Sequence, residues 1–428
     1  MTMASPSSVK YDILYDTGLY IFEYRSSDLN RNNEENKDDD FTPDRFKYQL
    51  RGLSTDTEVN IWTQFCAKCF SYKPNPPSSE YFRRHYFNDP MKDPKLIRVM
   101  STLNEGTSDI VSSVRIFRRL ISTGCKGVLK AGGIGEVCTL PSHRKRGLAK
   151  ALLSNALQIM SSEEENMECS LLHASQSLIS VYEKSGGYVS VPTKWSSVTL
   201  RSDILFNDII VGERNQMSLS VRLAQFPKDT KRLHEIHQVY SERRFAGCII
   251  RSMEYWNKYL RFEIGESIYV LTTDDDKGST STVNEDGIIS WLSIRPRDGR
   301  YQLQDFGKDL QLCEKIGLSI HSVMKKLLVS ALEQYGCDIT SSVHQLALHL
   351  PTPILQDIQD VRQECLWIDW SQEILEEDDN GWMYKSLPKH AMSSSVNSSD
   401  KASTRERDMV YLVQSLERPH LIWPADSF

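Results

Sequence analysis

The segment at residues 135–153 constrains the local fold more than any other part of the chain. A short apolar strand ends at Pro141, three basic residues follow at 144–146, and a helix with apolar periodicity begins around Gly147. The first N–H groups of a helix lack intrahelical partners, and the helix dipole favours negative charge beside them. Gly147 also lets the backbone approach a ligand closely. The segment therefore predicts a phosphate-binding turn between a strand and a helix, with a solvent-exposed basic helix start as the alternative.

The spacing of this turn separates it from other phosphate-binding motifs. It has neither the Gly-x4-Gly-Lys-Ser/Thr of P-loops nor the Gly-x-Gly-x-x-Gly of dinucleotide folds. Arg144-x-x-Gly147-x-Ala149 resembles instead the acetyl-coenzyme A (acetyl-CoA) signature of the GNAT N-acetyltransferase superfamily, Arg/Gln-x-x-Gly-x-Gly/Ala. The flanking order of strand, proline, turn, helix, strand and helix with Tyr182 is similar to the order in that family.

Length and composition indicate a globular protein of two domains. The chain has 428 residues, of which 39% are hydrophobic and 25% charged, so it can form two apolar cores. Its net charge of −6 disfavours a nucleic-acid-binding protein that relies on phosphate contacts. No apolar run approaches the ~18 residues of a membrane span, and the first residues lack the apolar run of a secretory signal.

The cysteines indicate free thiols in a reducing compartment. There are nine, an odd number, and they follow no repeating framework. Cys66 and Cys69 form the single Cys-x-x-Cys, and because they lie in an apolar helical pattern we favour buried thiols over a metal or redox site. We therefore expect a cytoplasmic or nuclear protein without a metal.

The first half predicts a regular succession of strands and helices. A hairpin around Asp16-Thr17-Gly18 comes first, and residues 30–40, rich in Asn, Glu and Asp, predict a flexible loop. The expected elements that follow are a strand from Phe46, a helix from an N-cap at Asp56 to Phe70, a helix at Ser79–Phe87, strands at Lys95–Ser101, Ile110–Ile121 and Gly133–Leu140, a helix from Gly147 to Met160, a strand at Glu168–Ala174, a helix with Tyr182 and a strand at Tyr188–Leu200. This order resembles one complete GNAT domain.

The second half echoes the first. The helical pattern at 327–335 resembles that at 152–160, and in both halves a strand pattern begins 18 positions after the start of the helical pattern. Gly317 remains where the phosphate-binding turn would lie, but the basic cluster and the proline are missing. We interpret this half as a GNAT-like domain that has lost cofactor binding. The alternative is a chance likeness between two amphipathic helices that each precede a strand.

The predicted fold class is α/β of the α+β kind, with a mixed, mostly antiparallel GNAT sheet flanked by helices and a second GNAT-like domain after it. Trp423 is the expected anchor of the C-terminal end. The predicted segments are an N-terminal extension with a hairpin and a flexible loop (1–41), the GNAT domain (42–202), the degenerate GNAT-like domain (203–388), a disordered loop (389–408) and an ordered C-terminal segment (409–428).

The resemblance implies a set of residues that bind acetyl-CoA. In GNAT domains a β-bulge lies in the strand before the turn, and main-chain groups of Val137 and Thr139 would pair with the pantetheine amides. Amides of Arg144 to Ala149 would hold the pyrophosphate, and a strand N–H would face the thioester oxygen. The implied cofactor-binding residues are Val137, Cys138, Thr139, Arg144, Lys145, Arg146, Gly147, Leu148 and Ala149.

Two residues are candidates for proton transfer. Glu136 is the single charged residue in the apolar strand and would act as the general base, with an exposed strand-edge glutamate as the alternative. Tyr182, in a pattern similar to the family's Tyr-x-x-x-Gly-aromatic but with one extra glycine, would protonate the leaving thiolate, unless it is a core tyrosine. His143 is expected to be solvated, and His173, in the next strand, is a reserve base.

Together these features predict an N-acetyltransferase that moves an acetyl group from acetyl-CoA to a primary amine through a tetrahedral intermediate. The acceptor would be a small molecule, a free amino acid, or the lysine or N-terminus of a protein, and we expect a monomer with no nucleic-acid or membrane partner. One alternative is a non-catalytic acyl-CoA-binding or scaffold protein. Another is an interaction module that does not bind coenzyme A.

Overall fold

The structure is a computed structural model that describes residues 12–14, 19–23, 45–103, 109–124, 127–207, 219–273, 287–337, 346–388 and 418–426. The chain divides into two units. Unit 1 comprises Met1–Phe87, Met91–Phe117 and Gly133–Glu165, and unit 2 comprises Asn88–Pro90, Arg118–Gly132 and Asn166–Phe428. The predicted loops at 30–40 and 389–408, and most of the predicted segment 409–428, lie outside the described residues.

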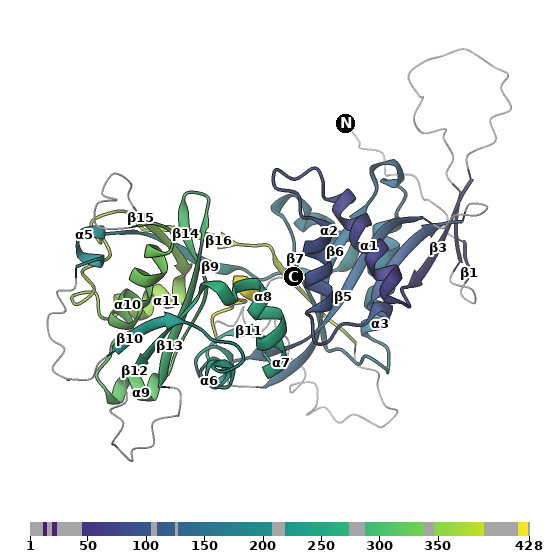
Figure 1. Ribbon diagram of the computed structural model, residues 1–428. Coiled ribbons are helices and arrows are strands. Elements are labelled where there is room, and N and C mark those ends of the chain that lie inside the picture. Colours follow the sequence, from purple (N-terminus) through teal and green to yellow (C-terminus); the bar gives the residue numbers. More distant parts are fainter. Residues whose placement is uncertain are drawn as a thin grey trace, which may run out of the picture. The chain divides into compact units, whose positions relative to one another are not determined.

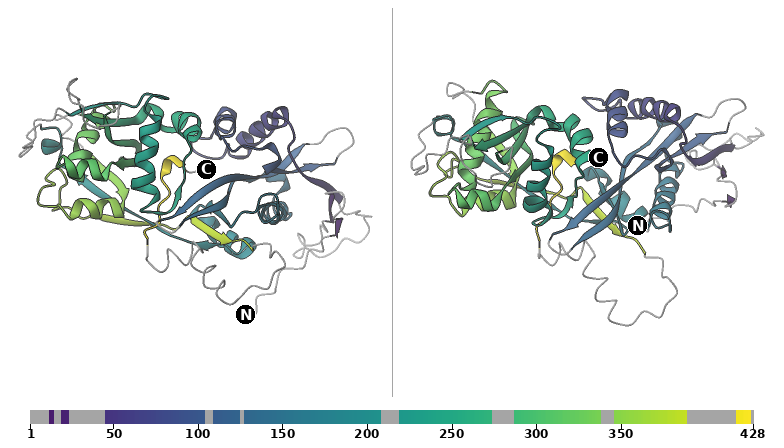
Figure 2. Two further views of the ribbon diagram at one scale, coloured as in Figure 1. Left: turned by 90° about the horizontal axis from the view of Figure 1, so that it is seen from below. Right: turned by 60° about the horizontal axis from the view of Figure 1, so that its bottom comes forward.

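Unit 1 is built on a sheet with helices on both faces. The strand order is β1 (Asp12–Leu14), β2 (Leu19–Glu23), β3 (Arg45–Gly52), β4 (Ile97–Thr102), β5 (Ile110–Thr123) and β6 (Val128–Thr139), with antiparallel pairing from β1 to β5. The antiparallel pairing of β1 with β2 is what the predicted hairpin requires, and its turn lies outside the described residues. Figure 2 shows α1 (Asp56–Cys69) and α2 (Ser79–Phe87), in purple, on one face of these strands and α3 (Leu148–Met160) on the other.

The apolar faces of α1 and α2 form the core of unit 1. Trp62 is fully buried and packs edge-on against Phe82 and Tyr86 of α2. Helix α1 begins as the sequence predicts, but the N-cap is Thr55 rather than Asp56. The Thr55 side chain accepts a hydrogen bond from the Glu58 N–H, which leaves Asp56 as the first helical residue, where its charge favours the helix dipole.

The long strands β5 and β6 continue into unit 2. There β5 pairs with β11 (Ala246–Ile249), and β7 (Cys169–His173) is followed across the sheet by β17 (Trp382–Ser386) and β8 (Val189–Ser190). Strand β17 comes from the end of the chain's second half, and its register sets Trp382 opposite His173. This insertion is not visible in the sequence pattern.

The strand that we predicted at Tyr188–Leu200 is divided between two sheets. Val189–Ser190 pairs with β17, whereas β9 (Thr193–Leu200) pairs with β15 (Leu346–Pro351) and β16 (Leu375–Asp379) in the second sheet. Pro192 lies between the two pieces and has no N–H to donate to a ladder, so the pairing is interrupted there. A single continuous strand was the wrong prediction.

The second sheet lies within unit 2 (Figure 1). Its order is β10 (Leu219–Leu223), β12 (Ile268–Thr273), β13 (Ile288–Arg297), β14 (Arg300–Lys308), β15, β9 and β16. Neighbouring strands of this sheet are antiparallel except β14 and β15, which are parallel and are joined through α9 (Leu310–Lys315) and α10 (Ile320–Glu333). A helical crossover between parallel strands is what a GNAT-like second half requires, and the predicted fold class is confirmed.

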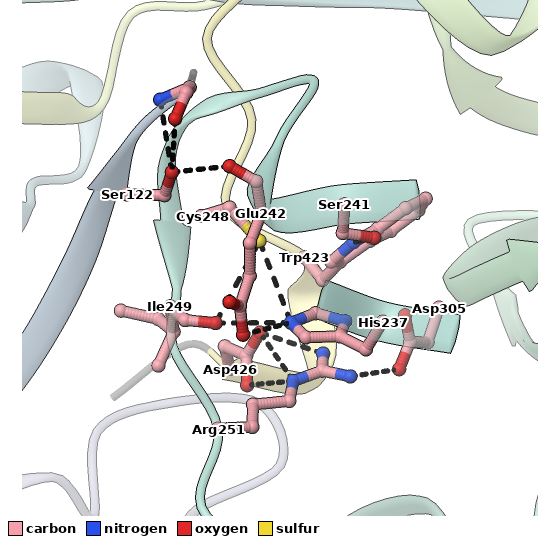
Figure 3. A network of polar contacts seen from close by, with 11 residues as sticks. Ser122, His237, Ser241, Glu242, Cys248, Ile249, Arg251, Asp305, Trp423 and Asp426 are labelled. Carbon is pink, nitrogen blue, oxygen red and sulfur yellow. Dashed lines mark hydrogen bonds and ion pairs between the residues drawn. The ribbon is translucent and has the colours of Figure 1, made fainter. Parts of the chain in front are cut away.

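The C-terminal segment 418–426 is anchored in unit 2. Trp423 is fully buried, as predicted, and donates its indole N–H to Ser241 at 3.2 Å. Figure 3 shows the deepest polar contact of this segment, in which Asp426 and Asp305 both receive hydrogen bonds from Arg251. Among the described helices, none is long and apolar enough to cross a membrane.

Candidate acyl-CoA site

Strand β6 is irregular at the residue that the sequence singles out. Glu136 has a φ of 44°, a left-handed conformation that is rare for a side-chain-bearing residue inside a strand. Ser113 and Ser112 of β5 donate their hydroxyl groups to the carbonyl oxygens of Glu136 and Cys138, both at 3.0 Å. Because strand backbone groups alternate in direction, the backbone of Val137 faces away from these contacts. This geometry is the kind that a bulge introduces.

The Glu136 side chain is buried rather than exposed at a strand edge. Its carboxylate lies 3.5 Å from the guanidinium group of Arg115, and only 8% of the glutamate side chain and 2% of the arginine side chain are exposed. Arg115 also lies over the ring of Phe117, 3.9 Å from its centroid. The carboxylate charge is therefore balanced within unit 1, an arrangement that the sequence did not indicate.

Between β6 and α3 the chain forms the predicted turn. Pro141–His143 makes one 3₁₀ turn, and Lys145 and Gly147 both take left-handed conformations, with φ of 61° and 76°. Helix α3 begins at Leu148, and no side chain caps its N-terminus. The first-turn N–H groups, including those of Leu148 and Ala149, thus meet the condition for binding an anion.

The basic side chains of this turn are held by specific contacts. Arg144 donates from Nε to the carbonyl oxygen of Thr139 at 3.1 Å, and Arg146 donates to the Tyr48 hydroxyl at 2.6 Å. The same hydroxyl lies 2.9 Å from Nδ1 of His143. Burial raises the pKa of Tyr48, an effect that Arg146 opposes, so the phenol is neutral near pH 7. Lys145 is exposed.

This contact corrects our expectation for His143, which is half-buried and bonded rather than solvated. Burial and the charge of Arg146 lower its pKa, so it is neutral near pH 7 and adds no positive charge to the turn. Tyr48 was missed by the sequence analysis. It lies 95 positions before His143 in β3, and no motif links the two.

The corresponding helix start in the second sheet lacks these properties. Ser319 caps α10 by accepting a hydrogen bond from the Ser322 N–H, and Gly317, with φ of 70°, stands two residues before it without a basic neighbour on either side. The side-chain cap occupies a backbone donor that α3 leaves available. Loss of cofactor binding in the second half stays a prediction.

The Cys138 thiol belongs to the core of unit 1, where it packs with the buried Cys66 and Cys69. Burial raises the pKa of the Cys138 thiol well above its ordinary value. The thiol therefore stays protonated near pH 7. The buried, unbridged Cys66 and Cys69 agree with the interpretation of that motif as structural thiols.

Tyr182 lies in unit 2 on α4 (Ile179–Gly186) and is partly buried. Burial raises the pKa of its hydroxyl, so the phenol keeps the proton that a general acid needs. The extra glycine in its motif has a local explanation. Gly187 follows the helix with a φ of 67° and donates its N–H to Glu183, a left-handed cap that favours glycine.

His173 ends β7 in unit 2, and its Nε2 lies 3.0 Å from each carboxylate oxygen of Asp379. The structure thus brings the cofactor-binding candidates of β6 and the turn together within unit 1, while Tyr182 and His173 belong to unit 2. The catalytic roles of Glu136 and Tyr182 stay predictions.

Comparison with known proteins identifies a similar family for one segment of the chain. The model of an acetyltransferase (GNAT) domain matches residues 51–189. This segment is similar to a GNAT domain. It includes the β6–α3 turn and Tyr182, and it supports acyl transfer as the general class of activity. No curated protein has a sequence that matches this chain.

Solved GNAT-type proteins share the fold beyond the matched domain. A probable N-acyltransferase from Enterococcus faecalis is 10% identical with a TM-score of 0.51, and the alignment covers 79% of this chain and 72% of that one. A GCN5-related N-acetyltransferase from Kribbella flavida is 13% identical with a TM-score of 0.50, and the alignment covers 80% of this chain and 71% of that one. A GCN5-related N-acetyltransferase from Anabaena variabilis is 16% identical with a TM-score of 0.50, and the alignment covers 80% of this chain and 73% of that one. At these identities the likeness shows the fold alone, and it extends over both sheets.

Proposed function

We propose that the chain is an N-acetyltransferase that moves an acetyl group from acetyl-CoA to a primary amine. The observation that carries the proposal is the start of α3, where a GNAT domain presents an uncapped helix N-terminus behind the basic residues 144–146. A pyrophosphate is the anion that this turn suits, because first-turn N–H groups and guanidinium groups both prefer phosphate oxygens.

The residues fit the donor as follows. Amides of Arg144 to Ala149 bind the pyrophosphate, and the side chains of Arg144, Lys145 and Arg146 supply positive charge. In β6 the backbone groups of Val137 and Thr139 pair with the pantetheine amides. The Thr139 carbonyl also accepts from Arg144 at 3.1 Å, a contact that ties the turn to the strand.

The reaction joins the amine nitrogen to the thioester carbonyl carbon and breaks the carbon–sulfur bond. A lysine-type amine has a pKa of about 10.4 and must lose a proton to attack, so a base is required near pH 7. Glu136 takes this proton, and Tyr182 donates its hydroxyl proton to the leaving sulfur. Small amines, free amino acids and protein amines remain candidate acceptors, and the protein is proposed to act as a monomer in the cytoplasm or nucleus.

A second candidate function is acyl-CoA binding without turnover. The observation that favours it is the buried ion pair of Glu136 with Arg115 at 3.5 Å, which gives the carboxylate a structural role that needs no catalysis. Both candidates predict cofactor binding, and they differ in whether coenzyme A is released.

The experiment that separates them is thiol release from acetyl-CoA in the presence of lysine, polyamine and peptide acceptors. An acetyltransferase releases coenzyme A in proportion to an added acceptor and forms the acetylated amine. Acetyl-CoA binding with no acceptor-dependent thiol release across the panel would contradict the first proposal and support the second.

A further inference from the structure

Unit 2 contains a cavity of about 540 Å³ that the proposed acyl-CoA site does not use. Its wall comes from the end of β7, from β9, from the β13–β14 turn with β14, from β15, from the end of β16 and the start of β17, and from the C-terminal segment. This volume is within the range of small-molecule sites, about 300–1,000 Å³. All lining residues belong to unit 2, so the cavity is a property of that unit alone.

Two indoles, with Ile422 and Pro424, form the apolar part of the wall. Trp195 and Trp382 are 5% and 4% exposed, so both are fixed by packing. His349 stacks on Trp195 with ring centroids 4.9 Å apart, and His173 meets Trp382 edge-on at 5.0 Å. Burial, together with Arg300, lowers the pKa of His349 to about 4, so this ring is neutral near pH 7. The aromatic wall is rigid, and its faces favour a cation.

The charges of the cavity leave an excess of carboxylates. Four carboxylates face two guanidinium groups, so the carboxylates outnumber the guanidinium groups by two. Arg300 binds Glu377 through two hydrogen bonds of 2.7 and 3.2 Å, and Arg297 lies 3.5 Å from Asp298. These two pairs cancel, and the excess charge is that of Asp378 and Asp379 at the end of β16.

Asp379 is held in the charged form. Burial alone would raise the pKa of its carboxyl group, but hydrogen bonds and charge from His173, with the N–H of Gly381, lower the pKa below its ordinary value. Asp378 is exposed, and the structure gives it no ion pair among the described residues. Asp378 and Asp379 thus place negative charge beside the indoles, where an anionic ligand would be repelled.

We propose that this cavity binds a small molecule through an ammonium group, which lies beside Asp378 and Asp379 and against the indoles of Trp195 and Trp382. Carboxylates and aromatic faces are the two protein groups that recognise an amine cation. The proposal goes beyond acetyl transfer. It does not depend on an acyl donor, and it stands or fails separately from the turn at α3.

The test uses the full chain without coenzyme A. Calorimetry and tryptophan fluorescence are followed during titration with spermidine and with choline, and 3,3-dimethylbutan-1-ol serves as the neutral shape match of choline. We expect both cations to bind and the alcohol to bind at least tenfold more weakly than choline. Equal binding of choline and the alcohol, or binding of neither cation, would overturn the proposal.

Variants locate the binding in the cavity. Asp378→Asn removes one charge from an exposed residue and is expected to weaken spermidine binding about tenfold, with a larger loss when Asp379→Asn is added. The matched control is Glu376→Gln, which removes a charge from the same strand but outside the cavity wall. Unchanged binding in Asp378→Asn with a normal thermal transition, or an equal loss in the Glu376 control, would refute the assignment.

The two proposals are also separated by experiment. A double variant of the turn, Arg144→Glu with Arg146→Glu, is expected to bind spermidine as the unmodified chain does. If the chain binds acetyl-CoA but no cation, only the cavity proposal fails. If it binds the cations but not acetyl-CoA, only the acyl-CoA proposal fails.

Discussion

Replacing Arg251 by methionine should destabilise unit 2 more than any surface change. The Arg251 side chain is fully buried and donates to Asp305 at 2.6 Å and to Asp426 at 2.7 and 3.0 Å (Figure 3). Both aspartates are also fully buried. Methionine keeps apolar contact with Trp256, over which the guanidinium lies, but leaves two carboxylates without their cation.

The magnitude follows from the burial. Removing one partner of a buried ion pair costs about 3–5 kcal/mol, and here two carboxylates lose the same partner, so we expect the upper end of that range. A loss of about 4 kcal/mol corresponds to a fall in Tm of roughly 8–16 °C for a unit of this size. The matched control is Arg201→Met. Its pair with Asp203 is exposed, and its loss should cost at most about 1 kcal/mol.

The assay is urea unfolding of the full chain at several pH values. Burial raises the pKa of Asp305 to about 6 even though Arg251 opposes that rise, so without the arginine the pKa rises further. A carboxyl group with a raised folded-state pKa contributes stability at low pH that is lost as the pH increases through that pKa. The stability of Arg251→Met relative to the unmodified chain should therefore recover as the pH falls from 8 to 5.

Neutralising the carboxylates by mutation should also restore the stability that Arg251→Met loses. The triple variant Arg251→Met/Asp305→Asn/Asp426→Asn removes all the charges that Figure 3 shows around the guanidinium except that of Glu242, and should regain at least half of the lost free energy. A loss in Arg251→Met no larger than in the Arg201 control would refute the reasoning. So would a loss that stays the same at pH 5 and pH 8, because it would not arise from buried charge.

Three further predictions concern other sites. Burial lowers the pKa of His420 to about 3, so its neutral ring stabilises the fold above pH 6.5 and this contribution is lost as the pH falls. In urea unfolding, the difference in stability between the unmodified chain and His420→Asn should narrow by about 2 kcal/mol from pH 6.5 to 4.5, and a constant difference would be contrary to this account. Gly307→Ala would place a methyl group in steric clash with the ring of Trp291 and should cost about 1–3 kcal/mol in thermal unfolding, whereas an unchanged Tm would show that the ring can move aside. Glu136→Gln should bind acetyl-CoA normally and release coenzyme A about 100-fold more slowly or worse, and an unchanged rate would exclude Glu136 as the base.

The sequence predicted those parts of the structure that depend on neighbouring residues. The turn at 141–147 and the start of α3 follow from a proline, a basic cluster and a glycine within a few positions, and the structure has them where expected. The family resemblance extended this to the fold class. The predicted GNAT-like second half rests on helix periodicity, which α10 confirms.

The features that were missed depend on residues far apart in the chain. The pairing of β17 with β7 joins Trp382 to His173, and nothing in the apolar pattern of either strand specifies its partner. Likewise, the sequence does not show whether a lone glutamate in a strand is exposed, catalytic or paired. For Glu136 the ion pair depends on the position of Arg115 on β5. Pro192 was a local signal for the change of sheet between β8 and β9 that the sequence analysis did not use.

Isothermal titration with acetyl-CoA tests the central claim most directly. The unmodified chain should bind one acetyl-CoA. Arg144→Glu/Arg146→Glu should abolish binding because it reverses the charge at the N-terminus of α3. The control Arg83→Glu/Arg84→Glu makes the same charge change on the exposed face of α2 and should bind normally. No heat and no thermal shift with the unmodified chain, or equal binding by both double variants, would contradict the account.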